Sequence, residues 1–172
     1  MKPKTILYIR NTDERNFIDV FVKLFLSYKV ESFVYDKYKP LEAIENINSY
    51  CKDNSIKLLV AFSFDAFLIL SCSSTLNKCI FNACFKPATY IKTKDWAKVE
   101  QQFYLNYTPD KDKKVIAYHT LSDEVFGGGG YRILCTGFYK YVYRLSCGHN
   151  ITYDACIEHK TKLLKWVQSK IG

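Results

Sequence analysis

Short apolar segments alternate along the chain with longer amphipathic ones, and this alternation constrains the fold more than any other feature. The clearest apolar run is 56–62, which is almost continuous in apolar residues, as expected of a strand buried on both faces of a sheet. Strands that alternate with helices are typical of βαβ units and a parallel sheet. The pattern predicts six strands, at residues 5–9, 30–35, 56–62, 78–85, 115–119 and 141–147.

The amphipathic segments between these runs have helical spacing. In residues 14–28, for example, Phe17, Phe21 and Leu24 recur every three or four positions, which places them on one helical face. Helices are predicted on this basis at residues 14–28, 41–53, 64–72, 94–106, 131–139 and 153–171. The glycines at 127–130 are not predicted to bind phosphate, because no Lys-Ser or Lys-Thr pair follows them as a phosphate-binding loop requires. They predict a flexible loop near the candidate functional site.

Length and composition indicate one globular domain. The chain has 172 residues, of which 48% are apolar and 24% are charged, which is the balance of a folded protein and not of a disordered one. The net charge is +8, yet the lysines are scattered and only four residues are arginine. A dispersed lysine surface of this kind favours solvation over a nucleic-acid interface, so nucleic acid is not expected as a partner.

The cysteines predict a reducing environment. Seven are present, an odd number, and several lie inside apolar runs, where a thiol behaves as a small hydrophobic group. No C-x-x-C pair occurs, so neither a zinc site nor a thioredoxin-like motif is predicted. The N-terminal apolar run is too short for a signal peptide, and no segment approaches the length of a membrane span. We therefore expect a cytoplasmic protein with no metal or cofactor, and the sequence leaves its oligomeric state open.

Three residues follow predicted strands in an order that indicates catalysis. Ser63, Asp123 and His149 each lie just past the carboxyl end of a strand, and parallel sheets build their sites at that edge. There His149 would be a general base, and the carboxylate of Asp123 would hold its imidazole in one tautomer.

Each of the three also has an ordinary structural interpretation. Ser63 is also a candidate strand-end or helix N-cap residue, Asp123 a candidate turn or N-cap residue, and His149 a candidate structural loop residue. Glu124 is the adjacent substitute for Asp123. Of the other histidines, His119 is expected to pack at a strand end and His159 to face solvent on the last helix.

Several segments resemble the α/β-hydrolase superfamily, in particular its small, single-domain, bacterial esterase-like members. Residues 61–66 are similar in frame to the G-x-S-x-G nucleophile elbow, with Ala61 and Asp65 in the place of the two glycines. Residues 118–125 resemble the acid loop of the family, and Asn82 and Pro87 match the strand end that follows the nucleophile helix. The resemblance covers most of the chain, from residue 4 to residue 167.

This resemblance implies a three-layer α/β/α sandwich around a mostly parallel sheet of about six strands. A small lid or insertion is implied at residues 90–112. It implies that Ser63 is the nucleophile, His149 the base and Asp123 the orienting acid. Main-chain N–H groups would form the oxyanion hole, from Phe64 on one side and from Asn11 or Arg10 on the other. The implied activity is that of an esterase or thioesterase acting on a small acyl substrate.

Departures from the family pattern keep two alternatives open. The glycines are replaced at 61 and 65, and Arg10 and Asn11 stand where the family has a His-Gly pair. In the first alternative, which these replacements motivate, the chain is a hydrolase-fold protein with impaired catalysis that serves as a binding or interaction module. A flavodoxin-like binding domain also fits the strand alternation, but it gives no role to Gly148 and His149.

Overall fold

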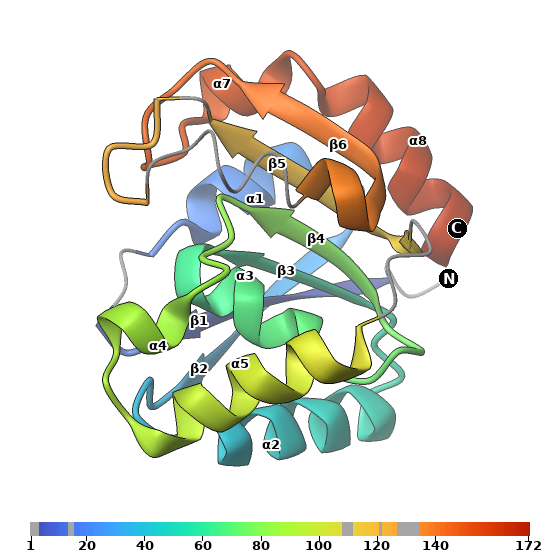
Figure 1. Ribbon diagram of the computed structural model, residues 1–172. Coiled ribbons are helices and arrows are strands. Elements are labelled where there is room, and N and C mark those ends of the chain that lie inside the picture. The colour runs from blue at the N-terminus through green and yellow to red at the C-terminus, as the bar shows by residue number, and fades with distance from the viewer. Residues whose placement is uncertain (1–3, 14–15, 108–111, 121, 127–134) are drawn as a thin grey trace.

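The six described strands form an open sheet in which every neighbouring pair is parallel. The computed structural model describes residues 4–13, 16–107, 112–120, 122–126 and 135–172 (Figure 1). The strand order is β2-β1-β3-β4-β5-β6, as expected for a mostly parallel sheet. The strands are β1 (Thr5–Asn11), β2 (Lys29–Tyr35), β3 (Leu58–Phe62), β4 (Asn77–Phe81), β5 (Asp112–Thr120) and β6 (Tyr139–Leu145).

Helices cover both faces of this sheet, so the predicted three-layer α/β/α sandwich is confirmed (Figure 1). Successive residues of a strand point to opposite faces; in β3, Leu59 belongs to one apolar core and Val60 to the other. The first core is shared by α2 (Pro40–Asp53), α3 (Ser63–Leu70) and α5 (Lys94–Asn106). The second is shared by α1 (Ile18–Leu24), α7 (Tyr153–Ile157) and α8 (Lys160–Ile171).

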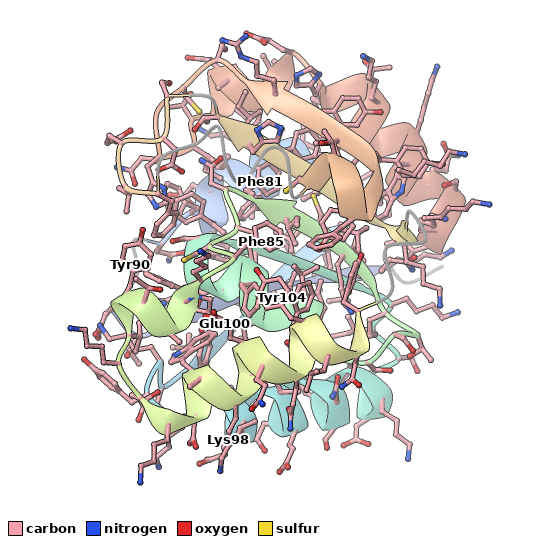
Figure 2. All side chains as sticks on the ribbon, viewed as in Figure 1. Phe81, Phe85, Tyr90, Lys98, Glu100 and Tyr104 are labelled. Carbon is pink, nitrogen blue, oxygen red and sulfur yellow. The ribbon has the colours of Figure 1, made fainter. Side chains whose placement is uncertain are left out.

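A short helix, α4 (Pro87–Tyr90), connects β4 to α5 and is held in place by two side chains of α5. Glu100 accepts a hydrogen bond from the Ala88 N–H at 3.1 Å. Tyr104 donates one to the Phe85 carbonyl at 2.7 Å (Figure 2). Within the segment 90–112, α5 buries Trp96, Val99 and Phe103 in the core.

The last helix differs from its prediction. Residues 153–171 were expected to form one helix, but α7 ends at Ile157 and α8 begins at Lys160. The break is tied to β6, because the His159 ring donates a hydrogen bond to the Arg144 carbonyl at 2.6 Å and Ser146 donates one to Glu158. The expectation that His159 faces solvent is also wrong, since its ring is partly buried beside Tyr143.

Other boundaries shift for local reasons. The helix predicted at 14–28 spans only Ile18–Leu24, and its first turn follows Asn16, whose side chain accepts the Ile18 N–H. The strand predicted at 78–85 stops at Phe81, because Asn82 turns the chain with a φ of 45°. In the helix predicted at 131–139, residues 135–138 are helical, Tyr139 already belongs to β6, and 131–134 lie outside the described residues, as do the glycines at 127–130.

No helix within the described ranges has both the length and the apolar character needed to cross a membrane.

Candidate active site

The order of the strands reverses between β1 and β3, and the candidate site lies at the carboxyl ends of these two strands. β2 lies on one side of β1, whereas the chain continues from β3 to β6 on the other side. In open parallel sheets such a switch point leaves a crevice beyond the strand ends, where ligands bind. Here the two strands end at Asn11 and Phe62.

Ser63 occupies a sharp strand-to-helix turn. Phe62 is extended, with φ −127° and ψ 150°, and Ser63 follows at once with a φ of 59° as the first residue of α3. Non-glycine residues at positive φ are strained and concentrate at functional sites. The turn has the form of a nucleophile elbow. The N-cap interpretation of Ser63 is not supported, because the N-cap of α3 is Phe62 and no side chain caps that helix.

Asp123 and His149 form a buried pair. His149 Nδ1 lies 2.9 Å from Asp123 Oδ2, and the other carboxylate oxygen accepts the N–H groups of Val125 and Phe126. Burial alone would raise the pKa of the Asp123 carboxyl, but the hydrogen bonds from His149 and the two N–H groups hold that pKa below its usual value. Because an ionised carboxylate only accepts hydrogen bonds, Nδ1 carries the proton and Nε2 is left as the basic nitrogen.

Aromatic rings enclose the imidazole. The centroid of the His149 ring lies 4.9 Å from that of Phe62, the residue directly before Ser63, and 4.7 Å from that of Phe126. Phe64, directly after Ser63, contacts Phe126 and Tyr90 edge to face. The residues on both sides of Ser63 therefore belong to the same ring cluster as the proposed base.

Two further side chains fix the backbone of His149. Glu124 accepts the His149 N–H at 3.0 Å, so this residue supports the loop, while Asp123 contacts the ring. Asn82 donates to the His149 carbonyl at 2.7 Å and accepts the Thr120 N–H at 2.9 Å. Gly148 leaves room for Glu124, since a Cβ there would lie 2.9 Å from its Oε2.

Asn82 was not identified as a site residue from the sequence. Two signals were available: its match to the strand end of the resembled family, and its residue type, because asparagine tolerates the left-handed backbone conformation better than other non-glycine residues. Its contacts join the end of β5 to the His149 loop.

Asp65 is buried and faces the end of β1. Its Oδ2 accepts the Asn11 main-chain N–H at 3.1 Å, and its Oδ1 accepts the Asn11 side-chain amide at 3.0 Å and the Tyr35 hydroxyl at 2.6 Å. The Asn11 N–H expected in an oxyanion hole is therefore bound to a carboxylate. Arg10 lies within β1, opposite Val34 of β2.

Phe64 is the third residue expected to supply a main-chain N–H to the oxyanion hole, beside Asn11 and Arg10. It is the second residue of α3, where a main-chain N–H has no acceptor within the helix.

A pocket of about 370 Å³ opens at this edge of the sheet. It is lined by Asn11, Asp13, Lys37, Phe62, Phe64, Tyr90, Ile91, His149 and Asn150. At its rim Lys37 pairs with Asp13 at 2.5 Å. A hollow of about 490 Å³ lies elsewhere, between α2 and α5, but neither Asp123 nor His149 borders it. The smaller pocket is taken as the candidate site because His149 lines it.

Among the described residues, no group of three or more His, Cys, Asp or Glu side chains is placed to hold a metal ion.

Solved structures with the same architecture include an esterase domain from Rhodothermus marinus. It superposes with a TM-score of 0.68 at 12% identity, over 99% of this chain and 88% of the other. This chain has an α/β-hydrolase-like fold. A second α/β-hydrolase-fold structure, described as a hydrolase of the α/β superfamily from Xanthomonas campestris pv. campestris, gives 0.66 at 10% identity, over 95% and 97% of the two chains.

A third α/β-hydrolase-like neighbour is SOBER1 of Arabidopsis thaliana, with a TM-score of 0.56 at 10% identity, over 98% of this chain and 99% of the other. No protein-family model matches the sequence, and no curated protein matches it. At identities of 10–12% these likenesses establish the fold, so the function has to be argued from the site.

Proposed function

We propose that this protein is a serine hydrolase of the esterase or thioesterase type, which acts on a small acyl substrate. Ser63 is the nucleophile, His149 the general base and Asp123 the acid that orients it. The observation that carries the proposal is the buried Asp123–His149 hydrogen bond of 2.9 Å at the same strand edge as a serine with a φ of 59°.

The proposed reaction has two halves. As Ser63 Oγ attacks the carbonyl carbon of the substrate, its proton passes to His149 Nε2, and the imidazolium returns that proton to the departing alcohol or thiol. Water, deprotonated by the same nitrogen, then attacks the acyl-serine ester; the bond to Ser63 Oγ breaks, the imidazolium returns its proton to that oxygen, and the acid is released. Throughout, Asp123 stays ionised and stabilises the imidazolium.

The oxyanion of each tetrahedral intermediate needs hydrogen-bond donors. The Phe64 N–H at the start of α3 is the donor best supported by the fold. Asn11 and Arg10 remain the proposed donors on the β1 side, although Asp65 holds the Asn11 N–H in this conformation.

The pocket indicates the size and polarity of the acyl group. Its walls include Phe62, Phe64, Tyr90 and Ile91, which offer an apolar surface. A volume of about 370 Å³ suits a small ligand. Tyr90 and Ile91 open the segment 90–112 and are the part of it that we propose as a lid.

Labelling with a fluorophosphonate tests the proposal. The probe should modify Ser63, as located by peptide mass mapping, and Ser63→Ala should abolish labelling. Ser71→Ala is a matched control, because Ser71 is a serine at the opposite end of α3, and it should label like the wild type. A folded protein that never reacts, even at alkaline pH where an imidazole is neutral, would contradict the proposal.

A second candidate is a binding or interaction module with the same fold and impaired catalysis. The engagement of the Asn11 N–H by Asp65 favours it, since one oxyanion donor is then occupied. Turnover of a p-nitrophenyl ester that disappears in Ser63→Ala would exclude this candidate.

A further inference from the structure

Asn11 lies at the same edge of the sheet as the proposed nucleophile. The parallel register pairs Ile9 of β1 with Ala61 of β3. Asn11 and Ser63 each lie two residues beyond this pair, so both stand at the carboxyl-end edge of two neighbouring strands. Asn11 also lines the same pocket as Phe64 and His149. Asn11 therefore borders the pocket in which the proposed reaction at Ser63 takes place.

Asp65 competes for the main-chain N–H of Asn11. Its carboxylate comes from the first turn of α3, two residues after Ser63, and is 1% exposed. It accepts both the main-chain and the side-chain N–H of Asn11. A carboxylate is a stronger acceptor than a neutral carbonyl, and its negative charge opposes the development of a second one nearby.

We infer that Asp65 limits the rate at which Ser63 is acylated, because it withholds the Asn11 N–H from the oxyanion. The inference rests on the proposed function. The residue stands where the elbow motif has its second glycine. A glycine cannot reach β1, whereas this aspartate ties α3 to Asn11 and to Tyr35 of β2.

Two substitutions test the inference. Asp65→Gly removes the competing acceptor, so the second-order rate of Ser63 labelling by a fluorophosphonate should rise about 10- to 100-fold, up to the lower end of the range that one oxyanion donor contributes. Asp65→Asn removes the charge but keeps a weaker acceptor, so it should give a smaller rise in the same rate.

Tyr35→Phe is the matched control for a general loosening of this cluster. It removes the 2.6 Å hydrogen bond to Asp65 but leaves both contacts between Asp65 and Asn11. Its labelling rate should stay within about twofold of the wild type, which is small on the scale of a lost donor. An equal increase in Tyr35→Phe and Asp65→Gly would overturn the inference, because loosening would then explain both.

The outcomes separate this inference from the proposed function. Circular dichroism and thermal unfolding identify the variants that fold, and Asp65→Asn decides the question if Asp65→Gly does not fold. Wild-type labelling at Ser63 with an unchanged or slower rate in the folded Asp65 variants would overturn the inference alone. No labelling in any folded protein would overturn the proposed function itself. Labelling gained only in the Asp65 variants would support the inference and identify the wild type as the catalytically impaired second candidate.

Discussion

His149 Nδ1 lies 2.9 Å from Asp123 Oδ2, and the two side chains are 9% and 5% exposed. The two residues are 26 positions apart and come from different loops. The hydrogen bond forms because β5 and β6 are neighbours in the sheet and both loops follow their carboxyl ends. With Asp123 bound to two main-chain N–H groups as well, the carboxylate is fixed from three directions.

Replacing Asp123 by asparagine should abolish most of the proposed activity. An amide that donates to Nδ1 would favour the tautomer in which Nε2 carries the proton, so Nε2 could not accept one from Ser63. A fall in kcat of about 10³- to 10⁴-fold is expected, measured with a p-nitrophenyl ester at neutral pH. In contrast, Glu124→Gln should change kcat only a few-fold, since its amide oxygen can still accept the His149 N–H. Equal losses in both variants would contradict the assignment.

Stability should fall in acid because of the same carboxylate. The pKa of Asp123 is lowered in the folded protein, so its contribution to stability is present above the unfolded pKa of about 4 and is lost as the pH falls through the lowered value. Urea unfolding at pH 7, 4 and 3 measures this loss. The free energy of unfolding of Asp123→Asn should depend less on pH than that of the wild type; identical slopes would show that Asp123 is not responsible.

Asn82→Ala should destabilise the protein by about 2–4 kcal/mol, because it removes two buried hydrogen bonds and places an alanine at positive φ. Asn82→Gly removes the same bonds without the backbone strain, so it should be more stable than Asn82→Ala by about 1 kcal/mol. Urea denaturation gives both values. If the glycine variant were the less stable of the two, the positive φ would not contribute to the cost.

The cysteines should differ sharply in reactivity. All seven are free thiols, and six of them are buried. Burial raises the pKa of Cys72, Cys135 and Cys156 to about 12, so these thiols stay protonated at neutral pH. Under native conditions iodoacetamide should modify the partly exposed Cys147 first, and Cys147→Ser should remove the first labelled peptide. Early modification of Cys72 would contradict this burial.

The strand pattern made most of the fold predictable. A sheet covered on both faces buries every residue of its central strands, as in Leu58–Phe62, and such continuous apolar runs are visible in the sequence. The positions of Ser63, Asp123 and His149 after strands followed from the same pattern, because parallel strands end at a common edge.

Contacts between distant residues were not predictable in this way. Asp65 and Asn11 are 54 positions apart, and nothing in either local sequence indicates that they meet. The break before α8 depends on the contact between His159 and the Arg144 carbonyl, whereas helical periodicity continues through it. The role of Asn82 likewise depends on Thr120 and His149, which only the folded chain brings near it.

The direct junction of β3 and α3 also limits how the length of this chain can change. α3 begins at Ser63, the residue after the last one of β3, and seven of its eight residues are buried. One residue inserted at the junction would turn the helix by about 100°, and every buried side chain from Asp65 to Leu70 would meet a different neighbour. A change of length at the junction of Phe62 and Ser63 should therefore abolish the proposed activity as completely as replacing Ser63 does.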